Sequence, residues 1–168
     1  MLKKQNYPSA SKSAFTLFEV LIVILIMGII TAVIISNSMG NRRSYVSQAA
    51  VSLGNDISVV RSEAITRNTP LKITFSPDGS YTVSDAQGII SLAGNDHFKR
   101  QLANGVLIDS VNFGAGNAIY FSSEGRPVAG SFESLQAISP SNSLVLKLGE
   151  YSKTISLNPV TGKVKISN

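Results

Sequence analysis

A single carboxylate interrupts a long apolar run near the start of the chain. Between residues 15 and 35 the only ionisable side chain is that of Glu19. An acid inside an apolar span costs about 2.5 to 3.5 kcal/mol on insertion scales, so it is a candidate functional group by default. The alternative is that Glu19, near one end of the run, extends to the membrane interface and has no further role. From the residues alone, both interpretations stay open.

Few other residues offer catalytic or metal-binding chemistry. The chain has no cysteine and one histidine, His97, which lies in a polar segment. A zinc site needs a second His or a Cys, and Asp78, Asp85 and Asp96 lack the spacing of a calcium loop. The sequence also has no Gly-x-Ser-x-Gly motif for a serine nucleophile. We therefore expect no catalytic residue, no metal and no cofactor, and we interpret His97 as an exposed residue.

The element that must position Glu19 is the apolar run itself. As a helix rising about 1.5 Å per residue, residues 15–35 would be roughly 31 Å long, which matches the apolar thickness of a bilayer. A cleaved secretory signal normally has a shorter apolar core. Residues 1–14 contain three lysines and no acid. The positive-inside rule therefore places the N-terminus in the cytoplasm and sends the rest of the chain across the membrane, despite Arg42 and Arg43.

The net charge does not by itself indicate a nucleic-acid partner. The formal charge is +5, but three of the 15 Lys and Arg residues lie within residues 1–14. The remaining 12 basic residues are nearly balanced by 10 acids. A small positive charge of this kind is weak support for nucleic-acid binding. The length beyond the apolar run, about 130 residues, is sufficient for one domain.

A helical stripe continues beyond the apolar run, with apolar residues three or four positions apart. The stripe consists of Val46, Ala50, Leu53, Ile57, Val60 and Ala64. We predict one helix over residues 15–68, ended by Asn68-Thr69-Pro70, because the residue before a proline is pushed out of the helical region. Gly40 and Gly54 weaken this helix, each by about 1 kcal/mol relative to Ala. The stripe is short for a coiled coil and favours packing on a sheet.

After Pro70 the apolar period changes to two residues, which is typical of half-buried strands. The turn sequence Ser76-Pro-Asp-Gly79 predicts a hairpin between the first two strands. The predicted strands are 71–75, 81–83, 88–92, 106–113, 118–121, 143–148, 153–157 and 163–166. We also expect a helical turn within 96–103 and a long connection over 127–141. A helix followed by strands indicates an α+β fold, with the long helix laid across an antiparallel sheet.

The sequence around Glu19 resembles a known processing site. Ala14-Phe15-Thr16-Leu17-Phe18-Glu19, after a short lysine-bearing leader, resembles the site that prepilin peptidase cuts in type IV pilins and type II secretion pseudopilins. The resemblance implies cleavage between Ala14 and Phe15, N-methylation of Phe15, and an assembly role for Glu19. The new ammonium at Phe15 of one subunit could neutralise Glu19 of a neighbour, although pairing within one chain competes. The family usually has Gly where this chain has Ala14, and Pro near Ser36.

Three further motifs resemble the GspH/FimT group of minor pseudopilins and minor pilins. They are Arg61-Ser-Glu-Ala64 at the helix end, Phe121-Ser-Ser-Glu-Gly-Arg126, and Thr161-Gly-Lys-Val-Lys165 at the last strand. Some FimT-type members bind DNA through a basic Gly-Arg-x-Arg at the last place. The resemblance therefore implies Arg126, Lys163 and Lys165 as candidate DNA-binding residues. The two lysines would project from one face of a strand about 7 Å apart, but they lack the bidentate fork of arginine.

The same motif residues also have a purely structural interpretation. Arg61, Glu63 and Arg67 would then be a charged helix face, and Gly125 and Gly162 would serve turns. Lys163 and Lys165 would be the solvated face of a strand, with Val164 and Ile166 facing the core. Taken one residue at a time, this interpretation is favoured.

The resemblance implies a pilin-like fold and a non-enzymatic minor pseudopilin or pilin subunit. We expect a prepilin leader over 1–14, a membrane and assembly helix over 15–36, and a periplasmic domain over 37–168 that includes the lower half of the helix. Expected partners are other pilin or pseudopilin subunits, prepilin peptidase and the bacterial inner membrane. The leading hypothesis is a subunit at or near the tip of a type II secretion pseudopilus. The alternative is a FimT-type minor pilin of a type IV pilus that binds DNA for uptake in natural transformation.

Overall fold

The computed structural model describes residues 16–92, 98–114 and 116–168, without the side chains of residues 32–40. One long helix, α1 (Leu17–Arg67), precedes all the strands. The strands are β1 (Leu71–Phe75), β2 (Ser80–Ser84), β3 (Lys99–Gln101), β4 (Leu107–Asn112), β5 (Ala118–Phe121), β6 (Pro127–Ser131), β7 (Ser134–Ala137), β8 (Ser143–Leu148), β9 (Tyr151–Leu157) and β10 (Val164–Ser167), and a 3-10 helix, η1 (Ala103–Gly105), lies before β4. The chain divides into two compact units, Met1–Met39 and Gly40–Asn168. The predicted α+β fold class is confirmed.

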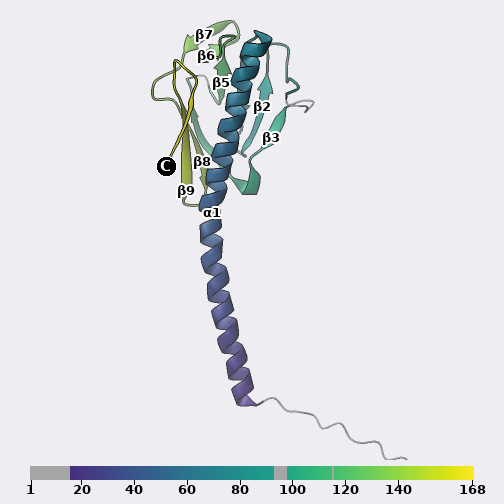
Figure 1. Cartoon of the computed structure of the whole chain (residues 1–168), viewed down its shortest axis with the longest axis vertical. Helices are drawn as coiled ribbons and strands as arrows, with labels where there is room; N and C mark the ends of the chain where they lie inside the picture. The colour runs from purple at the N-terminus through teal and green to yellow at the C-terminus, as the bar shows by residue number, and fades with distance from the viewer. Residues whose placement is uncertain (1–15, 93–97, 115) are drawn as a thin grey trace, which may run out of the picture. The chain divides into compact units, whose positions relative to one another are not determined.

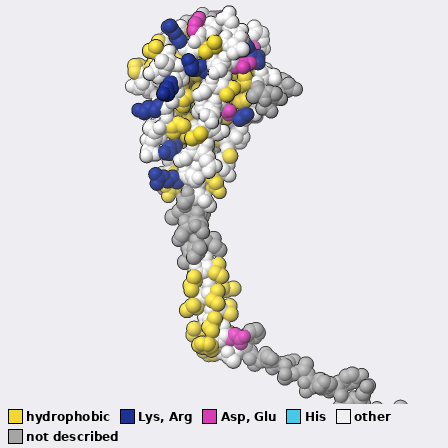
Figure 2. Space-filling view, in the orientation of Figure 1, with side chains coloured by type: hydrophobic (Ala, Val, Ile, Leu, Met, Phe, Trp, Pro, Cys, Tyr) yellow, Lys and Arg dark blue, Asp and Glu magenta, His cyan; other side chains and the backbone are white. Residues whose placement is uncertain are grey.

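The described part of the first unit exposes its side chains on every side. All side chains from residue 16 to residue 31 are exposed, and Figure 2 shows them as a mostly hydrophobic surface with one acidic group near its start. Within the residues that the structure describes, no helix has a stretch long and apolar enough to count as a membrane span. The expected span over 15–36 includes residues outside that described set, and it stays a prediction.

The second unit is built on the predicted helical stripe. Val46 is 1% exposed, and Ala50, Leu53, Ile57, Val60 and Ala64 are completely buried. The helix ends where the sequence predicts. Asn68 adopts a left-handed conformation with φ of 50°, and the Thr69 amide donates to the Ala64 carbonyl at 3.1 Å. This is a common way to close a helix end before an extended segment.

The strands form two antiparallel sheets instead of the one sheet that we expected. The larger has the order β3-β2-β1-β5-β6-β7, and the smaller has the order β10-β9-β8-β4. Figure 1 shows strands of both sheets beside the C-terminal half of α1. The buried residues of α1 and of both sheets make one hydrophobic core. Two sheets arise because strands with alternate buried residues, such as β1 and β8, each need an apolar face to cover, and one helix covers both.

Three predictions between the main strands are wrong. Residues 88–92 form an isolated bridge between Ser84 and Ile89 instead of a strand, because the Asp85 carboxylate accepts from the amides of Gln87 and Gly88 and turns the chain. The described part of 96–103 consists mainly of β3, and the helical turn η1 begins only at Ala103. The three residues of β3 are all exposed, so no alternation marks this strand. The connection over 127–141 contains the β6–β7 hairpin, whose mostly exposed residues carry little apolar pattern.

Candidate functional site

Glu19 lies in the first turn of α1 and is exposed. Its backbone amide donates to the Thr16 hydroxyl at 3.2 Å and to the Thr16 carbonyl at 3.1 Å. Thr16 and Glu19 therefore occupy the first and last positions of a Thr-x-x-Glu capping pattern, which the sequence analysis missed although the signal is local. A carboxylate is also favourable at a helix N-terminus. Ala14 and Phe15, the predicted processing and methylation residues, lie outside the described residues.

The three GspH/FimT-like motifs meet at the side chain of Arg61. Its Nε donates to the Gly125 carbonyl at 2.9 Å. A Cβ added to Gly162 would lie 2.9 Å from Nε of Arg61 and 3.1 Å from the Gly125 oxygen. Both glycines have positive φ values, 75° and 68°, so both turns require Gly for conformation. Space restricts both as well, because a Cβ on Gly125 would lie 2.6 Å from Cδ1 of Ile65. Arg61 is half-buried and joins the two turns, which goes beyond a charged helix face.

The candidate DNA-binding residues are exposed, and the structure brings their backbones near one another. Arg126 and Lys163 each follow one of the two glycines that contact Arg61, and Lys163 and Lys165 line a common hollow. Figure 2 shows several Lys and Arg side chains down the side of the globular unit where β8 and β9 lie in Figure 1. The pKa of Glu124 is lowered, first by a hydrogen bond from Ser122. An ionised Glu124 beside Arg126 offsets part of the positive charge.

The turn before β10 is fixed by two asparagines that the sequence analysis did not single out. The Asn158 side-chain oxygen accepts from the amides of Val160 and Thr161, both at 2.9 Å. The second asparagine, Asn142, is 3% exposed. Its side-chain Nδ2 donates to the Leu157 carbonyl at 2.8 Å, and its Oδ1 accepts from the Leu157 amide at 2.7 Å. Asn158-Pro159 is a readable turn signal, whereas a buried Asn has no periodic signature. These bonds hold the turn that presents Lys163.

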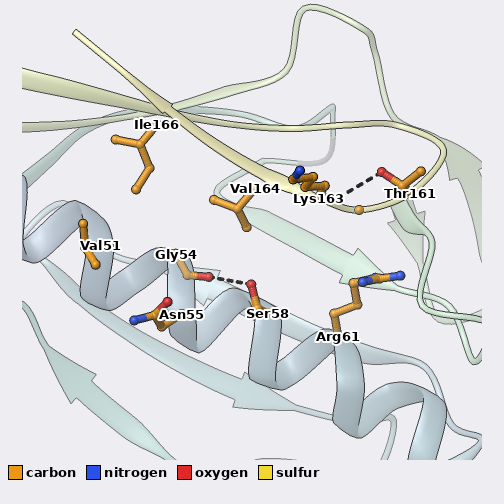
Figure 3. Close-up of a pocket in the computed structure, with 10 residues that line it drawn as sticks. Val51, Gly54, Asn55, Ser58, Arg61, Thr161, Lys163, Val164 and Ile166 are labelled. Atoms are coloured by element: carbon orange, nitrogen blue, oxygen red, sulfur yellow. Dashed lines mark hydrogen bonds between the residues drawn. The ribbon is translucent and has the colours of Figure 1, made fainter.

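A groove of about 690 Å³ runs between α1 and β10, and we call it the α1–β10 groove. Its lining consists of Val51, Gly54, Asn55, Ser58, Arg61, Thr161, Gly162, Lys163, Val164 and Ile166. Figure 3 shows Val164 and Ile166 pointing from β10 towards the helix. A Cβ on Gly54 would lie 3.2 Å from Cγ1 of Val164, so this glycine allows the strand to approach. Ile166 is 37% exposed; the prediction that it faces the core is wrong, because it faces the groove.

A polar clamp on another side of α1 was also missed. Asp56 accepts a hydrogen bond from the Tyr81 hydroxyl, and both of its oxygens lie 3.2 Å from Nη1 of Arg100. The Arg100 guanidinium lies 5.1 Å from the centre of the Phe98 ring. Burial, and then the bond to Asp56, raise the pKa of Tyr81 well above its usual value. The clamp ties α1 to β2 and β3.

Metal-ligating side chains are not grouped in the described part of the chain. No set of three or more His, Cys, Asp or Glu residues is placed there to hold a metal. His97, which we interpreted as an exposed residue, lies outside the described residues. Glu63 and Arg67 form a 2.7 Å ion pair one helical turn apart, with both side chains partly exposed. Arg67 Nη2 also donates to the Ser91 carbonyl at 2.9 Å, so this arginine joins α1 to a distant segment, which goes beyond the charged helix face of the structural interpretation.

The fold is that of a pilin-like subunit. It is similar to the structure of the minor pseudopilin EpsH from the Type 2 Secretion System of Vibrio cholerae, with a TM-score of 0.50 over 73% of this chain and 95% of that chain. The two sequences are 14% identical, so the likeness concerns the fold. No curated protein sequence matches the chain significantly.

Two family models match successive parts of the chain. The prokaryotic N-terminal methylation motif matches residues 9–35, and the type II transport protein GspH matches residues 49–161. The second match covers more than half of the chain. The chain therefore belongs to the GspH family of the type IV pilin and pseudopilin superfamily, and the resemblance predicted from the motifs is confirmed.

Proposed function

We propose that this chain is a minor pseudopilin of a type II secretion system, and not an enzyme. Prepilin peptidase cuts it between Ala14 and Phe15 and methylates Phe15. Residues 15–36 anchor it in the bacterial inner membrane as a single pass, with the N-terminus in the cytoplasm and residues 37–168 in the periplasm. It then joins other pseudopilin subunits at or near the tip of the pseudopilus.

One observation carries this proposal. From residue 16 to residue 31, α1 exposes apolar side chains on every side, and Glu19 is the one acid among them. In water such a surface needs a partner, because apolar area of this extent is unfavourable when solvated. Lipid before assembly and neighbouring helices after assembly would both supply that partner. The methylation motif over residues 9–35 supports the same sequence of events.

Glu19→Ala in the native host tests the proposal. The carboxylate would lose a neighbouring Phe15 ammonium, and we expect incorporation into sheared filaments to fall about tenfold, the equivalent of about 1.4 kcal/mol. Secretion of exported proteins should fall with it. Glu63→Ala is the matched control, since Glu63 also lies on α1 but pairs with Arg67 within the helix. Filament incorporation of Glu19→Ala at the level of Glu63→Ala would contradict the assembly role.

A second candidate function rests on the exposed basic residues. Arg126, Lys163 and Lys165 would make two or three phosphate contacts in a FimT-type minor pilin that takes up DNA. Each contact adds about −0.9 to the slope of log affinity against log salt on duplex DNA. Full-length protein in detergent should then shift duplex DNA at low salt with a slope of about −2 to −3. Binding that survives Lys163→Ala with Lys165→Ala would exclude these residues, and absence of binding would exclude this function.

A further inference from the structure

The last strand, β10, has one unpaired edge. It is the terminal strand of the smaller sheet and pairs only with β9 within the described strands. The Asn158 amide donates to the Lys163 carbonyl at 2.9 Å, so the peptide groups of Lys163 face β9. Along a strand of an antiparallel pair, successive residues direct their backbone N–H and C=O groups alternately towards the partner strand and away from it. The N–H and C=O groups of Val164 and Ile166 therefore point away from β9, towards the open edge.

The α1–β10 groove lies along that open edge, and its helix side combines an apolar valine with polar side chains. Val51 of α1 is 53% exposed, and Asn55 and Ser58 beside it are also exposed. Val164 and Ile166 form the opposite wall (Figure 3). A strand added to β10 would lie about 4.8 Å from it. It would therefore extend the smaller sheet over the exposed flank of α1 and cover Val51.

The charge of the groove selects among extended partners. Arg61 and Lys163 line it, and Lys165 lines the adjoining hollow. Among the described residues that line these two hollows there is no acid. Lysines on an edge strand discourage unspecific pairing with strands of other chains. A strand that carries carboxylates can pair with such an edge, because its charges are opposite to those of the lysines. The same lining contains no aromatic residue to stack on nucleic-acid bases, and its valine and isoleucine side chains suit a peptide better.

We propose that the α1–β10 groove binds an extended acidic segment of a partner protein, which adds to β10 as the next strand of the smaller sheet. Backbone hydrogen bonds to Val164 and Ile166 supply affinity that depends little on sequence. Alternate apolar side chains of the segment cover Val51 and Ile166, and its carboxylates lie near Arg61 and Lys163. The inference depends on this groove and not on the secretion role, so either can fail without the other.

A pair of synthetic peptides tests this binding mode on the purified full-length chain in detergent. Both peptides are fluorescein-labelled and share a sequence of alternating Val and Thr. They differ at a matched set of positions, where one peptide has Glu and the other has Lys. Fluorescence anisotropy should give an affinity at least about tenfold higher for the Glu peptide, a difference of about 1.4 kcal/mol. Equal affinities for the two peptides would overturn the proposal. So would binding of single-stranded DNA without binding of the Glu peptide.

Two matched pairs of variants then separate the backbone from the side chains. Ile166→Pro removes the outward N–H without removing a bond to β9, whereas Ile166→Ala keeps that N–H. We expect the Pro variant to bind the Glu peptide about tenfold more weakly than the Ala variant. Val51→Glu should weaken binding similarly, while Val59→Glu, at a valine of α1 that is 45% exposed and outside the groove, should not. Equal binding by the members of either pair would overturn strand addition in the groove.

Discussion

The two halves of α1 are both helical, but they differ in what covers their apolar side chains. From residue 16 to residue 31 every side chain is exposed, including Leu17 at 84% and Ile24 at 66%. In the second half, Leu53, Ile57 and Val60 are completely buried. A helix that is apolar all round needs partners from outside the chain, whereas an apolar stripe finds its partner in the chain's own sheets. Folding therefore depends on the second half, and assembly is the role that we propose for the first.

The largest expected effect comes from truncating one residue in each half. Leu53→Ala removes buried methyl groups from the core and should lower the free energy of unfolding by about 2 to 5 kcal/mol. Ile24→Ala is the matched change in the first half and should alter it by no more than about 0.5 kcal/mol. Thermal unfolding of the full chain in detergent, followed by circular dichroism, measures both. Comparable losses would mean that the first half is packed within the chain.

This contrast could be predicted from the sequence because both patterns are periodic. The stripe from Val46 to Ala64 fixed the buried face of α1, and Asn68 with Pro70 fixed its end. The strands with alternating apolar residues were also predicted, but β3, β6 and β7 were missed because few of their side chains are buried. The division into two sheets was missed as well, because alternation indicates which face is buried and not which strands are neighbours.

The candidate site was less predictable than the fold. The motifs identified Arg61, Gly125 and Gly162 separately, but only the structure shows that they touch. Asp56, Tyr81 and Arg100 are far apart in sequence, so no local pattern relates them. The role of Gly54 could not be predicted either. A glycine inside a helix is expected only to destabilise the helix, until the strand that packs against it is known. Contacts between distant segments are the part that single-sequence patterns do not contain.

An intermediate effect should follow from changing the contact of Arg61 with the Gly125 and Gly162 turns, which holds β10 near the second half of α1. Gly162→Ala introduces a Cβ 2.9 Å from Arg61, and the alanine must adopt the positive φ of this position. Gly116→Ala, where φ is also positive but nothing lies within 4 Å, carries the conformational strain alone. We expect losses of about 1 to 3 kcal/mol for Gly162→Ala and about 1 kcal/mol for Gly116→Ala. Equal losses in chemical denaturation would show that the Arg61 side chain moves aside without cost and that its contact with the Gly162 turn contributes little stability.

The smallest effect concerns the polar clamp on the second half. The pKa of Tyr81 is raised above its usual value of 10.0, so above pH 10 the folded state retains a proton that the unfolded state has lost. The free energy of unfolding should therefore fall as the pH rises through this range. Tyr81→Phe should cost about 1 kcal/mol at neutral pH and should show a shallower fall above pH 10. A fall of the same steepness in the variant would place the titrating group elsewhere.

The most direct test of the central claim, that the first half of α1 is an assembly segment made available by pilin processing, is the mass of the chain from its native membrane. Mass spectrometry of the intact protein and of its N-terminal peptide should show a chain that begins at N-methylated Phe15 and lacks residues 1–14. A chain that retains Met1 in a strain with active prepilin peptidase would contradict the account.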